Sequence, residues 1–109
     1  MTTIAVDAMG GDQAPQATVE GALLAARELP VRILLVGQRN ALEPLLGKSY
    51  PSIEIVDAPE VIGAADQPVM AVRHKRGSSM VIALGLVRSG RASAIVSAGN
   101  TGALLAGGL

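Results

Sequence analysis

The sequence contains no cysteine and almost no aromatic residues. None of the 109 residues is a cysteine, and Tyr50 is the single aromatic residue. Without cysteine, disulfides, thiolate metal ligands and a cysteine nucleophile are excluded, and the absence suits a reducing compartment. One tyrosine gives no stacking platform for nucleic-acid bases. Lysine plus arginine and aspartate plus glutamate both number 9, so no excess of positive charge points to nucleic acid or to an anionic membrane.

Long hydrophobic runs are also missing. The longest strongly apolar run, residues 80–87, is far shorter than the roughly 18 residues that a membrane-spanning helix needs. Residues 1–9 contain Asp7 and no basic residue, unlike a signal peptide. Half of the chain is hydrophobic and 17% is charged, which excludes intrinsic disorder. Residues 101–109 stop inside an apolar stretch, so we expect residues 1–109 to be the N-terminal portion of a longer domain.

Short β-branched runs alternate along the chain with longer helical stretches. Strands are expected at 3–7, 32–37, 53–57 and 94–97, helices at 15–29, 40–46, 68–75, 78–89 and from Asn100 onward, and a loop at 58–66. This order predicts an α/β fold of three αβα layers with a mainly parallel sheet. The helix at 78–89 is apolar nearly all round, which predicts a central position or a subunit contact.

The first candidate site is a glycine-rich turn after the first strand, with Asp7, Gly10, Gly11 and Asp12. Adjacent glycines let backbone N–H groups approach a ligand, and the following helix N-terminus favours an anion. The two aspartates would repel that anion unless they orient a cationic partner or bind a metal. The alternative is a tight turn in which Asp12 caps the helix.

A second glycine-rich turn follows the fourth strand. It contains Ser97, Gly99, Asn100, Thr101 and Gly102. Two hydroxyls, an amide and exposed backbone N–H groups at a helix start would form a cradle for an anion or an oxyanion. The alternative is a simple turn in which Asn100 caps the helix.

A basic run leads directly into a helix N-terminus that carries two hydroxyls. Its residues are Arg73, His74, Lys75, Arg76, Ser78 and Ser79. Positive charge, hydrogen-bond donors and a positive dipole end together suit phosphate recognition. The alternative is a solvated basic linker with a structural histidine.

Several familiar signatures are absent. No G-x-G-x-x-G follows the first strand, Leu42 stands where a P-loop ending in residues 47–49 would need glycine, and no G-x-S-x-G is present. The single histidine lies in no spacing that suits zinc. The sequence therefore predicts neither a metal site nor a cofactor.

Together these blocks resemble the N-terminal part of the bacterial phosphate acyltransferases of the PlsX type, acyl-[acyl-carrier-protein]:phosphate acyltransferases. The matching positions are residues 4–12, Pro15, Asp66, Pro68, Ala71, Arg73, Lys75, Ser78, Ser79 and residues 97–103. The resemblance covers nearly the whole chain in the right order, although members of the family are much longer.

The resemblance implies a transferase of phospholipid synthesis. Inorganic phosphate would attack the fatty acyl thioester of acyl carrier protein and give acyl phosphate. The family is similar in fold to the isopropylmalate and isocitrate dehydrogenases and uses no nicotinamide. Its members are cytoplasmic homodimers that contact the membrane peripherally, through parts outside this sequence.

Ionised phosphate is itself a nucleophile, so the site must hold an anion beside a thioester and stabilise an oxyanion. We expect Lys75 and Asn100 to be catalytic. Substrate or phosphate binding is expected of Asp7, Gly10, Gly11, Asp12, Arg73, Ser78, Ser79, Ser97, Gly99, Thr101 and Gly102.

Two other interpretations stay open. One is a metal- and NAD-dependent hydroxyacid dehydrogenase or a phosphotransacetylase of similar fold. A dehydrogenase would be recognised by its requirement for a nicotinamide cofactor and a divalent ion. The other is a non-catalytic α/β fragment or assembly module, which stabilisation by phosphate would separate from a competent site.

Overall fold

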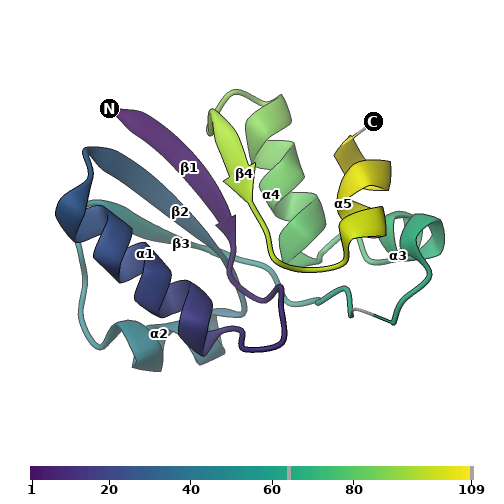
Figure 1. The fold of residues 1–109 in the computed structure, drawn as a ribbon, viewed down its shortest axis with the longest axis horizontal. Helices are drawn as coiled ribbons and strands as arrows, with labels where there is room; N and C mark the ends of the chain where they lie inside the picture. Colours follow the sequence, from purple (N-terminus) through teal and green to yellow (C-terminus); the bar gives the residue numbers. More distant parts are fainter. Residues whose placement is uncertain (64, 109) are drawn as a thin grey trace.

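A parallel four-stranded sheet with helices on both faces forms the centre of the computed structural model, which describes residues 1–63 and 65–108. The strands are β1 (Thr2–Asp7), β2 (Val31–Gly37), β3 (Ile53–Asp57) and β4 (Ala94–Val96). The helices are α1 (Gln16–Glu28), α2 (Arg39–Leu46), α3 (Pro68–His74), α4 (Ser79–Arg88) and α5 (Thr101–Gly108). The order in the sheet is β3-β2-β1-β4 (Figure 1). The predicted α/β class and its layers are confirmed.

Every predicted strand and helix is present, with ends that differ by at most one residue. The helix expected at 15–29 runs from Gln16 to Glu28, and local signals explain other ends. The Ser78 side chain caps α4 by accepting the Val81 N–H at 3.2 Å. Of the residues expected to form the loop at 58–66 and the last helix, Ala64 and Leu109 lie outside the described ones.

Alternate side chains of the strands face two separate cores. Ile33 and Leu35 of β2 point toward α1 and α2, where they pack with Val19 and Leu42. Their neighbours Leu34 and Val36 point to the opposite face and pack against α4. This alternation explains why the strands are apolar on both faces.

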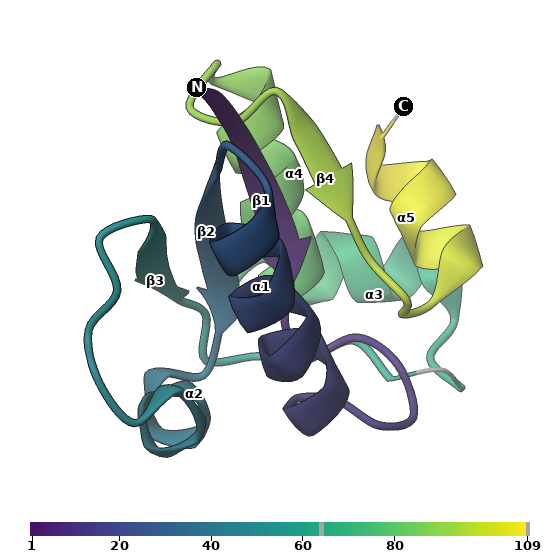
Figure 2. The same cartoon turned by 60° about the vertical axis from the view of Figure 1, so that its left-hand side comes forward.

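A third core connects α4 with α3 and α5. It consists of Ile62, Ala71, Met80, Leu84 and Ala103. Helix α4 therefore packs on the sheet with one side and on α3 and α5 with the other (Figure 2). The expected central position of this helix is confirmed, and its near-complete apolar surface follows from its two partners.

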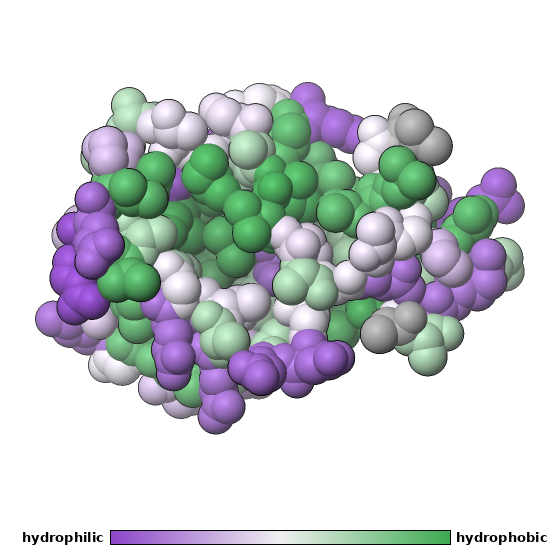
Figure 3. Space-filling view, viewed as in Figure 1, coloured by the Kyte–Doolittle hydropathy of each residue, from purple (hydrophilic) through white to green (hydrophobic). Residues whose placement is uncertain are grey.

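The face of the sheet that carries α1 is only partly covered. Between α1 and α5, over β1 and β4, the surface is apolar (Figure 3). A hollow of about 490 Å³ lies there, lined by Ile4, Val6, Thr18, Gly21, Ala22, Ala25, Leu29, Val31, Ile33 and Val96. Val96 of the edge strand is 57% exposed. A contiguous apolar surface of this kind is typical of a contact with further protein.

Among the described residues, no helix combines the length and apolar character needed to cross a bilayer.

We expect the core beneath α1 to control stability. Leu35 is fully buried, so Leu35→Ala should lower the free energy of unfolding by about 2–5 kcal/mol. Leu24→Ala on α1 is the matched control, since that side chain is 48% exposed and should cost far less. Denaturant unfolding of the complete polypeptide that contains residues 1–109 measures both. Equal losses would contradict the assigned core.

Candidate functional site

A buried carboxylate joins three segments at the carboxyl end of the sheet. Asp7 is the last residue of β1 and is 2% exposed. Its Oδ1 accepts the Ser79 hydroxyl at 2.5 Å, and its Oδ2 accepts the Ser97 hydroxyl at 2.8 Å. Ser79 begins α4 and Ser97 follows β4. The positive end of the α4 dipole favours the negative charge at this position.

The two glycine-rich turns are in direct contact above Asp7. A Cβ on Gly10 would lie 2.7 Å from Asp7 Oδ2 and 2.9 Å from the Gly99 nitrogen. Gly11 has a φ of +102°, and a Cβ there would meet Ala98 at 3.2 Å. Side chains are thus excluded where the turns meet. Close backbone approach, which was expected toward a ligand, occurs here between the turns themselves.

A cleft of about 230 Å³ opens beside this contact. It is lined by Met9, Gly11, Asp12, Val61, Ile62, Gly63, Ala98 and Gly99. The backbone N–H groups of Gly11, Asp12 and Ala98 have no acceptor within residues 1–63 and 65–108. They are donors available to a ligand, and Asp12 is the one charged side chain among the lining residues.

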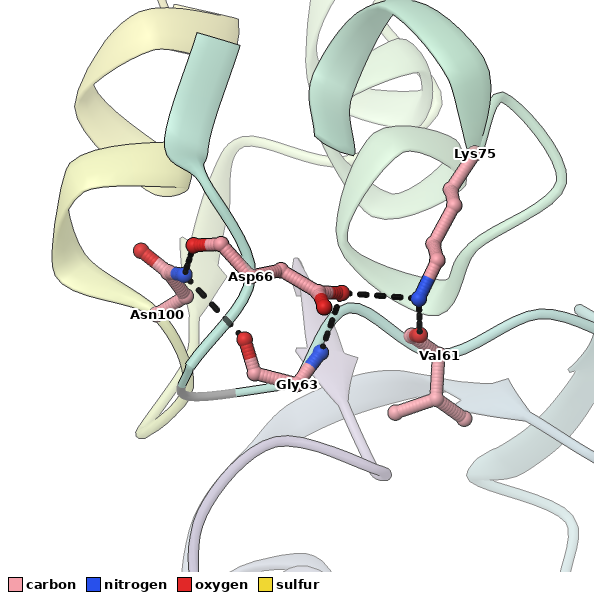
Figure 4. Close-up of polar contacts among 5 residues, drawn as sticks. All are labelled: Val61, Gly63, Asp66, Lys75 and Asn100. Atoms are coloured by element: carbon pink, nitrogen blue, oxygen red, sulfur yellow. Dashed lines mark hydrogen bonds and ion pairs between the residues drawn. The ribbon is translucent and has the colours of Figure 1, made fainter. Parts of the chain in front are cut away.

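One wall of the cleft is formed by the segment that follows β3, and Lys75 fixes this segment in place. Its Nζ donates to Asp66 Oδ2 at 2.7 Å and to the Val61 carbonyl at 3.0 Å (Figure 4). The same Asp66 oxygen accepts the Gly63 N–H at 2.9 Å. The ammonium group is therefore occupied by the wall and does not stand free in the cleft.

Asn100 holds the same wall from the other turn. Its Nδ2 donates to the carbonyls of Gly63, at 3.1 Å, and Asp66, at 2.9 Å (Figure 4). Its Oδ1 accepts the Ala103 N–H at 2.9 Å, so the interpretation of Asn100 as the cap of α5 is confirmed. We call the contacts of Lys75 and Asn100 with Val61, Gly63 and Asp66 the clamp.

The clamp lowers the pKa of Asp66. The largest cause is the hydrogen bond from Lys75, followed by the hydrogen bond from the Gly63 N–H, while partial burial opposes both. A lowered pKa means that the ionised carboxylate stabilises the folded state at pH values above the usual pKa. That contribution is lost as the pH falls through the lowered pKa.

The remaining predicted site residues lie around this centre. The Ser78 hydroxyl is buried in its capping bond, and Gly102 allows α5 to approach Pro68, which a Cβ would meet at 2.7 Å. Thr101 is exposed at the start of α5. Arg73 is exposed on α3, with no ion pair or side-chain hydrogen bond to the described residues.

The alternative interpretation of the first turn, with Asp12 as a helix cap, is wrong. Helix α1 begins at Gln16 after Pro15 and has no side-chain cap. Asp12 instead lines the cleft. Whether any of these residues binds substrate stays a prediction.

Sequence reasoning missed the wall of the cleft. Val61 and Gly63 fell in an expected loop, and Asp66 counted only toward the resemblance. Asp66 and Lys75 are nine residues apart with α3 between them, so no helical spacing connects them. The one available signal was the presence of both residues in the resemblance.

Comparison with known proteins assigns the chain to a family. The profile of the family described as "Fatty acid synthesis protein" matches residues 2–109. The chain belongs to this family. The glycine-rich turns, the clamp and the cleft all lie within the matched residues.

Members of the family are identical to this chain at about half of the aligned positions. A phosphate acyltransferase of Clostridioides difficile is 50% identical over 109 residues, which cover 97% of this chain and 32% of the relative. One of Levilactobacillus brevis is 55% identical over 107 residues, covering 97% and 31%. One of Koribacter versatilis is 54% identical over 108 residues, covering 95% and 30%. The expected resemblance is confirmed, and the chain spans about a third of these relatives' length.

The contact between the turns predicts that alanine substitutions at two glycines have very different effects on stability. Gly10→Ala forces a methyl group against the Asp7 carboxylate and the Gly99 backbone, and should lower the free energy of unfolding by about 1–3 kcal/mol. Gly21→Ala in α1 meets nothing within 4 Å and should be neutral or stabilising, by up to about 1 kcal/mol. Urea unfolding distinguishes them. A neutral Gly10→Ala would mean that the turns are not in contact.

The clamp also predicts that the Asp66 carboxyl titrates with a lowered pKa. The carboxyl carbon of Asp66, followed by NMR, should titrate below its usual value of 3.8. Lys75→Met should return this pKa toward the usual value, because the largest cause of the shift is removed. The carboxyl of Glu54 serves as the internal control, because its pKa is lowered chiefly by the hydrogen bond from Arg32 and should stay lowered in Lys75→Met. An Asp66 pKa that does not change in Lys75→Met would contradict the ion pair.

Proposed function

We propose that this chain supplies the phosphate-binding part of an acyltransferase. The reaction transfers a fatty acyl group from acyl carrier protein to inorganic phosphate and forms acyl phosphate for phospholipid synthesis. The observation that carries the proposal is the cleft where the two glycine-rich turns meet, with the N–H groups of Gly11, Asp12 and Ala98, for which the described part of the chain provides no acceptor. The names of the relatives support the acyl transfer.

The chemistry needs position and electrostatics more than a reactive side chain. A phosphate oxygen attacks the thioester carbonyl carbon and forms a C–O bond, while the carbonyl oxygen becomes an oxyanion. The C–S bond then breaks, and the carrier thiolate leaves and takes up a proton. Backbone N–H donors that are fixed before the reaction stabilise phosphate or oxyanion charge without reorganisation.

The start of α5 supports the same use. Thr101 is exposed there, and the N–H groups of Thr101 and Gly102 have no acceptor among the described residues. The positive end of the α5 dipole adds to these donors. Asp12 opposes an anion in the cleft, but it is exposed, so solvent and salt screen its charge.

Lys75 and Asn100 remain the residues on which we expect activity to depend. Both position the wall through the clamp, 2.7–3.1 Å from its carboxylate and carbonyl oxygens. Asp7, Ser79 and Ser97 are proposed to position the turns rather than to touch substrate, because their polar atoms bond to one another.

The wider expectations from the resemblance stay proposals. A position at the N-terminus of a longer domain agrees with the open apolar face over β1 and β4. The expectation of a cytoplasmic homodimer with peripheral membrane contact rests on the resemblance alone.

The test measures phosphate-dependent formation of acyl phosphate by the complete polypeptide that contains residues 1–109. Misplacing the wall of a site by about 1 Å typically lowers the rate about 10²-fold, and we expect Lys75→Ala and Asn100→Ala, which each remove part of the clamp, to lose about this much. Arg27→Ala, exposed on α1, is the control and should keep normal turnover. Thermal unfolding verifies that each variant is folded. Near-normal turnover of both clamp variants would remove them from the site.

A further inference from the structure

An exposed patch on and just after α3 lines no part of the cleft. It combines basic side chains at the end of the helix with apolar ones at its start. Its members are Val69, Met70, Arg73, His74 and Arg76, all exposed. We call it the α3 patch. Val69 and Met70 are 45% and 50% exposed.

The arginines of the α3 patch are not neutralised by ion pairs. The ion pairs among the described residues join Arg32 and Arg91 to Glu54, and Lys75 to Asp66. Glu60, the acidic residue bonded to the turn after α3, accepts the Gly77 N–H. Two guanidinium groups therefore stand at the surface without a carboxylate partner in the part of the chain that the structure describes.

The α3 patch lies directly behind the clamp. A surface hollow of about 210 Å³ is lined by Asp66, Gln67, Met70, Ala71, His74 and Lys75. The ion pair between Asp66 and Lys75 is thus shared: it fixes the wall of the cleft and forms part of this hollow. A molecule on the patch would stand beside the wall of the cleft.

We propose that the α3 patch docks the protein that delivers the acyl thioester, through an acidic surface of that protein. The inference rests on the proposed function and names its macromolecular partner. Arginine forks bind carboxylates with two parallel hydrogen bonds, and exposed charges of this kind steer association. Val69 and the flexible Met70 supply an adaptable apolar contact for a protein surface.

The experiment uses a pair of variants with the same change in charge. Arg76→Glu with His74→Glu alters the patch, and Arg27→Glu with Gln16→Glu alters exposed positions on α1. Acyl carrier protein is the donor in one series, and the same acyl group on pantetheine is the donor in the other. We expect the patch variant to raise KM for the carrier-bound donor about tenfold or more, with the pantetheine donor unaffected. The α1 variant should match the unmodified enzyme in both series.

A direct measurement of binding to acyl carrier protein tests this inference separately from the proposed function. If the unmodified protein produces no acyl phosphate, the proposed function fails. Fluorescence anisotropy with labelled acyl carrier protein then tests docking by itself: weaker binding in the patch variant alone supports it. Equal binding by both variants, or none by the unmodified protein, overturns it. Loss of binding to phosphatidylglycerol vesicles with unchanged carrier affinity would also overturn it, and would assign the patch to a membrane.

Discussion

The buried Asp7 carboxylate is the interaction on which the rest of the site depends. A carboxylate in the interior is tolerated only when its charge is compensated, and here two hydroxyls and a helix N-terminus compensate it. Those hydroxyls belong to Ser79 and Ser97, so the same bonds fix the start of α4 and the end of β4. Without the carboxylate, the buried Ser79 hydroxyl would be left unpaired, at about 1–3 kcal/mol, and the Ser97 hydroxyl would keep only the hydrogen bond that it accepts from the Gly99 N–H.

The topology explains why the turns meet at this carboxylate. Strand β1 has β2 on one side and β4 on the other, so the chain leaves β1 in one direction and returns to pair on its opposite edge. In parallel sheets ligands bind where the strand order reverses in this way, beyond the carboxyl ends. The turns after β1 and β4 are the two connections at that point. The cleft therefore lies where the fold class alone would put a binding site.

The sequence predicted the elements well because their signals are local. Apolar periodicity predicted α1, and the apolar stretch between Ser78 and Ser89 predicted α4, which the Ser78 side chain caps. The partners of polar side chains were less accessible, because 72 residues separate Asp7 from Ser79 and 90 separate it from Ser97. Ser79 was expected to offer a donor to a ligand, whereas its hydroxyl donates to Asp7. Only the tertiary arrangement decides which acceptor a hydroxyl reaches.

The clamp changes how an anion would be held. The sequence suggested Lys75 as a charge for phosphate, but Asp66 Oδ2 accepts a hydrogen bond from its Nζ at 2.7 Å and balances that charge. What the lysine contributes to the cleft is the position of Val61 and Gly63. On the proposed function, an anion would then rely on backbone donors whose directions are fixed by the turns, and such donors cannot rotate away as a long side chain can. Because Asn100 bonds to the same wall and caps α5, a shift of the wall would also shift the start of α5. The shape of the cleft therefore depends on the charged contacts of the clamp.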